Sequence, residues 1–149
     1  MLDFGESLNA IVDRFKLDAY NKQISLHFSS STSALINADI SYFNQIFENL
    51  LSNAIKFSPA EKNIYVTISD NNGKVTAAVR DEGPGLSDED KKKLFNKYQK
   101  LSAKPTGNES STGLGLSIVK KFVESMNGKI WCESEPGNGA TFFVQFPKA

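Results

Sequence analysis

Two asparagines and a lysine fall on one strip of a predicted helix. Asn49, Asn53 and Lys56 recur at i, i+4 and i+7, a spacing that places them on one side at about 100° per residue. Asparagine is a poor helix former, and amide oxygens are ligands that Mg²⁺ accepts beside water and phosphate. The strip therefore fits a metal–phosphate site in which the lysine balances phosphate charge. A solvated polar face with two incidental asparagines is the alternative, which this helix alone slightly favours.

A second pattern is the turn Asp81-Glu82-Gly83-Pro84-Gly85, which directly follows a predicted strand. Glycines that flank a proline make a tight turn and let a ligand approach the backbone closely. An acidic group at the end of a strand can accept a hydrogen bond from an exocyclic amine. A plain connection between a strand and a helix is the alternative for this segment.

A third pattern, Gly113-Leu114-Gly115-Leu116, opens a predicted helix. Glycines at this position expose backbone N–H groups, and the helix dipole favours anions there. We expect Leu114 and Leu116 to anchor the loop in the core. The sequence contains no Gly-x4-Gly-Lys-Ser/Thr motif, which excludes a P-loop, and no Gly-x-Gly-x-x-Gly motif after a strand, which weakens a dinucleotide-binding interpretation.

The elements that must position these residues follow from hydrophobic periodicity and turn signals. Adjacent hairpins predict a mixed, mostly antiparallel sheet, and three or four helices on one face of it give an α+β fold, a two-layer α/β sandwich. We expect helices at 6–22, 40–57, 88–98 and 116–126, strands at 24–28, 35–38, 64–69, 74–80, 129–133 and 141–146, and a loop at 101–112.

Composition excludes several classes of protein. The chain has 149 residues, of which 40% are hydrophobic and 23% charged, as in an ordinary globular domain. Its 17 basic residues balance its 17 acidic ones, which argues against nucleic-acid binding and against direct contact with a membrane surface. The lone Cys132, predicted to fill space in a strand, excludes a disulfide scaffold. The N-terminus lacks the features of a signal peptide, so we expect a cytoplasmic setting.

In their order along the chain, the three motifs resemble the N, G1 and G2 boxes of the ATP-binding catalytic domain of sensor histidine kinases. This family shares a Bergerat-type fold group with gyrase, heat-shock chaperones and mismatch-repair ATPases. Residues 94–98 resemble its F box, and 128–142 resemble its closing hairpin. The resemblance implies an ATP-binding domain at 23–149, and it implies that 1–22 are a linker and first helix following a dimerisation domain.

The resemblance also implies a site for ATP and Mg²⁺. Asn53 would bind the metal with Asn49 assisting, Asp81 would accept a hydrogen bond from the adenine amino group, and Phe57 would pack on the adenine ring. The other nucleotide-binding residues that it implies are Lys56, Gly83, Gly85, Thr112, Gly113, Leu114, Gly115 and Leu116.

The resemblance also implies that Asn49 and Lys100 are the catalytic residues. Lys100 lies in a segment, 97–112, that resembles the family's lid over the triphosphate, at a position where the family often carries an arginine; lysine keeps the charge but loses the bidentate fork. Hydrolytic relatives place a glutamate at the position of Asn49 to activate water. An amide cannot act as a general base, so we expect the chain to present the γ-phosphate to a histidine imidazole instead.

The partners implied are a histidine-bearing dimerisation domain upstream and a response regulator or receiver domain. The only histidine, His27, lies in a predicted strand and is interpreted as structural, so the chain alone is expected to be monomeric and unable to phosphorylate itself. The resemblance leaves open a membrane anchor elsewhere in a longer parent protein. Two other functions stay open: a nucleotide-sensing module without transfer, which Lys100 favours, and a clamp ATPase, against which Asn49 argues.

Overall fold

The computed structural model describes residues 1–31, 33–95 and 115–149. Predictions that fall on 96–114, which include Lys100, Thr112, Gly113, Leu114 and the lid-like loop, lie outside the described residues. The elements are β1 (Leu2–Asp3), α1 (Phe4–Asn21), β2 (Ser25–Ser30), β3 (Leu35–Ile36), α2 (Ile40–Phe57), β4 (Asn63–Asn71), β5 (Lys74–Asp81), α3 (Asp88–Lys93), α4 (Gly115–Ser125), β6 (Lys129–Ser134) and β7 (Ala140–Pro147).

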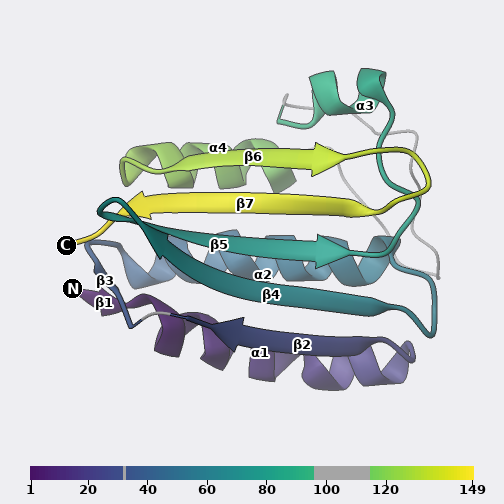
Figure 1. The fold of residues 1–149 in the computed structure, drawn as a ribbon, viewed down its shortest axis with the longest axis horizontal. Coiled ribbons are helices and arrows are strands. Elements are labelled where there is room, and N and C mark those ends of the chain that lie inside the picture. Colours follow the sequence, from purple (N-terminus) through teal and green to yellow (C-terminus); the bar gives the residue numbers. More distant parts are fainter. Residues whose placement is uncertain (32, 96–114) are drawn as a thin grey trace.

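Five strands form one mixed sheet in the order β2-β4-β5-β7-β6. The strands β2 and β4 run parallel, whereas the other neighbours are antiparallel. Helices α1, α2 and α4 lie together behind this sheet, while α3 lies beyond its end beside β6 (Figure 1). The predicted two-layer α/β sandwich is therefore confirmed. A second sheet pairs β1 with β3, and β1 was not predicted because two residues carry no periodicity.

Helix α2 is the central helix, because it packs against both α1 and α4 and against β5. Asp39 caps its start as predicted, accepting hydrogen bonds from the backbone N–H groups of Ser41 and Tyr42. The ring of Phe4 in α1 packs edge-on against Phe43 of α2, with ring centroids 5.3 Å apart. The buried stripe of α2 matches the predicted one: Phe43, Ile46, Phe47, Leu50, Leu51 and Ala54.

The last turn of α2 is held by a lysine from the end of α1. Lys22 Nζ donates to the backbone oxygens of Ile55 and Lys56, at 2.8 and 3.0 Å. These carbonyls lie in the last turn of the helix, where a cation also complements the helix dipole. The contact fixes the end of the helix that carries Asn53 and Phe57.

Two helix boundaries differ from their predicted positions by two residues or more, and the others agree to within one residue. Helix α1 starts at Phe4 rather than at residue 6, because Asp3 accepts a hydrogen bond from the N–H of Glu6 and caps the helix earlier. Helix α3 ends at Lys93, followed by turn residues, although its predicted cap, Ser87, is observed. None of the helices in the described part of the chain has the length and apolar character needed to span a bilayer.

Candidate functional site

A cavity of about 480 Å³, including its open mouth, lies between α2 and the end of β5. Among the described residues that line it, the polar side chains are Asn53 and Asp81, which come from two of the three sequence motifs. The remaining wall is largely apolar and closes the cavity from several elements. Its lining residues are Asn53, Ala54, Phe57, Asp81, Pro84, Gly85, Leu86, Leu116, Ala140 and Phe142.

Asp81 is placed by the central strand of the sheet. It is the last residue of β5 and lies opposite Ala140 of β7 in the antiparallel register. Its Oδ1 accepts two backbone hydrogen bonds, from Gly83 N at 2.9 Å and from Ala140 N at 3.3 Å. Burial raises the pKa of this carboxyl, and the two N–H donors offset part of the rise. The site therefore contains a buried carboxylate that is fixed by backbone donors and faces an apolar cavity.

The turn after Asp81 packs so closely against the β6–β7 turn that side-chain atoms do not fit between them. A Cβ on Gly85, whose φ is +75°, would lie 2.2 Å from the backbone oxygen of Glu135. A Cβ on Gly139, also at φ +75°, would lie 2.1 Å from the backbone oxygen of Asp81. A Cβ on Gly83 would lie 2.5 Å from the backbone oxygen of Phe57. Gly83 and Gly85, predicted from the turn motif, thus permit close backbone packing as well as a tight turn.

The helix side of the site brings the first and third motifs together. A Cβ on Gly115, the first residue of α4, would lie 3.1 Å from Oδ1 of Asn49, so the glycine leaves space beside that amide. Asn49 Nδ2 donates to the backbone oxygen of Gln45 at 2.8 Å, which orients the amide oxygen away from its own helix turn. Asn49 and Asn53 lie one turn apart on α2, and their amide oxygens are a donor type that could hold Mg²⁺.

Not every predicted site residue lines the cavity. Asn53, Phe57, Asp81, Gly85 and Leu116 do. The other predicted site residues that the structure describes are not among the lining residues: Asn49, Lys56, Gly83 and Gly115.

Sequence reasoning missed Phe142 and Ala140 of β7 as parts of the wall. Strand alternation could have found them, because both share the parity of the buried Val144 and Phe146.

Three further residues bear on the chemistry. Glu48, next to Asn49, pairs with Arg14 of α1, with Nη2 and Oε1 3.0 Å apart. The pKa of Glu82 is lowered, mainly because its Oε1 accepts a hydrogen bond from the backbone N–H of Asn63 at 2.6 Å. Burial raises the pKa of the Cys132 thiol to about 12, so the thiol is protonated at neutral pH.

The chain is similar to proteins of known family over its whole length. A family model described as "Histidine kinase-, DNA gyrase B-, and HSP90-like ATPase" matches residues 38–149. The sensor protein kinase WalK of Staphylococcus haemolyticus is 30% identical over 149 residues, which cover 99% of this chain and 24% of WalK. Sensor protein EvgS of Escherichia coli K12 is 37% identical over 136 residues, covering 87% of this chain and 11% of EvgS. The chain therefore spans less than a quarter of the length of these relatives.

Solved structures of similar proteins share the fold. The catalytic domain of histidine kinase ThkA, in a nucleotide-free form, superposes with a TM-score of 0.85 at 29% identity and covers 99% of this chain and 93% of that chain. Full-length ShkA in complex with AMPPNP superposes with a TM-score of 0.86 at 28% identity, and the match covers 99% of this chain and 30% of ShkA. ThkA in complex with response regulator TrrA superposes with a TM-score of 0.81 at 28% identity, and the match covers 99% of this chain and 41% of that chain.

Proposed function

Since the chain belongs to the histidine kinase-, DNA gyrase B- and HSP90-like ATPase family, we propose that it is the catalytic domain of a sensor histidine kinase. In this role it binds ATP and presents the γ-phosphate to a histidine on a separate dimerisation domain. Family membership implies ATP binding, and the relatives named sensor kinases make the kinase branch the best supported. The observation that carries the proposal is the cavity whose wall combines Asn53 and Phe57 of α2 with the buried carboxylate of Asp81.

The base of the nucleotide is assigned to the sheet end of the cavity. Both backbone donors bind Oδ1 of Asp81, so we assign its second oxygen, Oδ2, to the exocyclic amino group of adenine. Phe57 and Phe142 supply aromatic surface on the same cavity wall, where the base would lose its contact with water. A carboxylate held by the backbone accepts such a hydrogen bond without reorganising, which favours an amine over a carbonyl at that position.

The phosphates are assigned to the helix side. Asn49 and Asn53 would hold Mg²⁺, and the space beside Oδ1 of Asn49, which a Cβ on Gly115 would fill, fits a ligand at this place. A bound Mg²⁺ would neutralise the charge on the phosphates. Asn53 and Asn49 orient the triphosphate relative to the base that Asp81 holds. Lys56 and Lys100 are proposed to contact phosphate, the latter from outside the described residues.

Transfer to a histidine is favoured over hydrolysis by the residues around Asn49. The amide of Asn49 cannot take a proton from water, and the neighbouring Glu48 is paired with Arg14 on the side of α1. The bond between the γ-phosphorus and its bridging oxygen would break, a bond to an imidazole nitrogen would form, and ADP would leave with the electron pair. The chain's only histidine is exposed on β2 and stacks on Tyr65 at 4.9 Å, which supports an acceptor on another domain.

A response regulator is proposed as the next acceptor of the phosphoryl group. One similar structure, ThkA, is recorded in complex with its response regulator TrrA, which supports a partner of this class. The division of the chain into a linker helix at 1–22 and a catalytic domain at 23–149 also stays a prediction. Helix α1 packs into the common core through Phe4 and Leu8, so it belongs to the folded unit whatever precedes it.

A transfer experiment tests the proposal. The chain is mixed with [γ-³²P]ATP, Mg²⁺ and a separately produced dimerisation domain that carries the acceptor histidine, and label on the added domain is measured. We expect label on the added domain, none when its histidine is replaced, and little free phosphate. Tight ATP binding without label would favour a nucleotide-sensing module instead, and steady release of phosphate by the chain alone would favour a clamp ATPase.

A further inference from the structure

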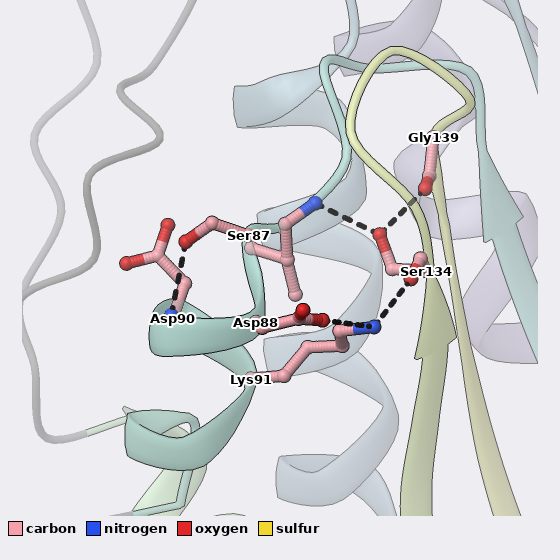
Figure 2. Close-up of polar contacts among 7 residues, drawn as sticks. Ser87, Asp88, Asp90, Lys91, Ser134 and Gly139 are labelled. Atoms are coloured by element: carbon pink, nitrogen blue, oxygen red, sulfur yellow. Dashed lines mark hydrogen bonds and ion pairs between the residues drawn. The ribbon is translucent and has the colours of Figure 1, made fainter.

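A single serine at the end of β6 links three segments around the nucleotide site. The Oγ of Ser134 donates to the backbone oxygen of Gly139 at 2.7 Å and accepts from the backbone N–H of Leu86 at 2.8 Å. Its own backbone oxygen accepts from Nζ of Lys91 at 2.8 Å, and that Nζ also pairs with Asp88 at 3.3 Å. Figure 2 shows Ser134 between the Gly139 turn and the start of α3. The hydroxyl therefore uses both its donor and an acceptor site, the first with Gly139 in the adjoining turn and the second with Leu86, which is distant in sequence.

The contact with Gly139 leads directly to Asp81. The carbonyl of Gly139 and the N–H of Ala140 belong to one peptide unit, which is planar and trans. Ser134 binds the oxygen of this unit, and its N–H donates to Oδ1 of Asp81 at 3.3 Å. Because the unit is rigid, holding its oxygen sets the direction in which its N–H points. A hydrogen bond at one end of an amide also polarises the other end and strengthens the bond made there.

The contact with Leu86 acts on another part of the wall of the same cavity. Leu86 lines the cavity, is 6% exposed, and ends the glycine turn that begins after Asp81. The turn is also fixed by a hydrogen bond from Gly137 N to the backbone oxygen of Pro84 at 2.6 Å. Ser134 is thus bonded to the peptide that orients Asp81 and to the residue that closes the pocket beside it.

We propose that Ser134 is a positioning residue for recognition of the nucleotide base, acting through the Gly139–Ala140 peptide on Asp81 and through Leu86 on the pocket wall. This inference rests on the proposed function, because it takes adenine as the group that Asp81 contacts. Loss of the hydroxyl leaves the carbonyl of Gly139 without its donor and lets the N–H of Ala140 turn away from the carboxylate. Discrimination between a base with an exocyclic amine and one with a carbonyl at that position then decreases.

The test compares dissociation constants for ATP and ITP, which differ by an amine or a carbonyl at this position of the base. Calorimetry is done on the wild type, Ser134→Ala and Ser134→Thr in the presence of Mg²⁺. We expect the wild type to bind ATP more tightly than ITP by about tenfold or more. Ser134→Ala should reduce that preference by roughly fivefold, mostly by weakening the binding of ATP. Ser134→Thr keeps a hydroxyl and should restore the preference.

A matched control separates positioning from general stability. Ser125 also donates its hydroxyl to a backbone oxygen, that of Phe122 at 2.7 Å, but it lies at the far end of α4. Ser125→Ala should leave the ATP to ITP ratio at the wild-type value. If Ser134→Ala does not fold, as judged by thermal unfolding, Ser134→Cys replaces it, because a thiol of similar size is only a weak donor.

The outcomes distinguish this inference from the proposed function. A wild type that discriminates ATP from ITP while Ser134→Ala or Ser134→Cys keeps the same ratio would overturn the role of Ser134 and leave the nucleotide site intact. A wild type that binds neither nucleotide would overturn the proposed function, and this inference with it. If Ser134→Ala weakened the binding of ATP and of ITP equally, this would also contradict the inference, since that is the effect expected of a merely structural residue.

Discussion

The two sides of the cavity are built in different ways. On the base side, which comprises Asp81 to Leu86 and the turn from Glu135 to Gly139, two backbone turns interlock at distances that only glycine allows. On the helix side, Asn49 and Asn53 project from a regular helix whose own stability comes from its buried stripe. The comparison teaches that on the base side the backbone contacts that stabilise the fold also position the recognising carboxylate, whereas on the helix side the stabilising residues and the recognising residues only share a helix.

Gly85→Ala should have the largest effect and tests the interlocked side. Its φ of +75° strains any other residue, and its Cβ would lie 2.2 Å from the backbone oxygen of Glu135. We expect a loss of roughly 3 kcal/mol in the free energy of unfolding, measured by urea denaturation. Gly137→Ala is the matched control and should cost only about 1 kcal/mol, because Gly137 has a φ of +83° but no atom of the described residues lies within 4 Å of its Cβ position. Equal losses in the two variants would show that the turns do not interlock.

Asp81→Asn should separate binding from folding on the base side. The asparagine oxygen can still accept from Gly83 and Ala140, but its NH₂ would face the adenine amine, donor against donor. We expect ATP binding to weaken by about 2 kcal/mol, measured by calorimetry. Because burial raises the pKa of Asp81, its ionised form opposes folding above that pKa, and the variant should be as stable as the wild type or more stable at pH 7. Asp13→Asn, on the exposed face of α1, serves as the control.

Full ATP affinity for Asp81→Asn would contradict the assignment of this carboxylate to the base. The same pKa shift predicts that ATP affinity in the wild type falls on acidification at a higher pH than an ordinary aspartate would give, because the protonated carboxyl is a poorer acceptor.

Glu82→Gln should have the smallest effect on stability. The pKa shift of Glu82 is opposite in sign to that of Asp81. The pKa of Glu82 is lowered by Asn63, so its contribution to stability is present above its ordinary pKa and is lost as the pH falls through the lowered value. Urea denaturation between about pH 3 and pH 6 should therefore show a weaker loss of stability on acidification in Glu82→Gln than in the wild type. Glu135→Gln, an exposed change in the neighbouring turn, should follow the wild type. Identical profiles for all three proteins would contradict the role given to Asn63.

The features that the sequence predicted are those with a local cause. The apolar period and the Asp39 cap predicted α2, and the strand ending at Asp81 followed from alternation. Ser134 escaped prediction, because its partner Leu86 is 48 residues away and contributes only a backbone N–H, which leaves no side-chain signal. The lysine that holds the end of α2, Lys22, was missed for the same reason.

The same division between local and long-range causes applies to the candidate site. Side chains that motifs place by local geometry, such as Asn53 and Asp81, do lie on one cavity. The apolar wall contributed by Phe142 depends on which strands become neighbours, which periodicity does not specify. The roles of the individual residues stay predictions. The family match carries the fold, and the relatives named sensor kinases support the proposed sensor-kinase branch.

The most direct measurement is calorimetric titration of ATP, with Mg²⁺ and with EDTA, into the wild type, Asn53→Ala and Asn44→Ala. Asn44 is a half-buried asparagine of the same helix that does not line the cavity, so its variant matches the change in side chain and in helix. We predict that Mg²⁺ strengthens ATP binding in the wild type and in Asn44→Ala, and that Asn53→Ala loses about tenfold in affinity for Mg-ATP while unfolding at nearly the same urea concentration. An Asn53→Ala protein that binds Mg-ATP as tightly as the wild type would contradict the account of this helix as the metal and phosphate side of the site.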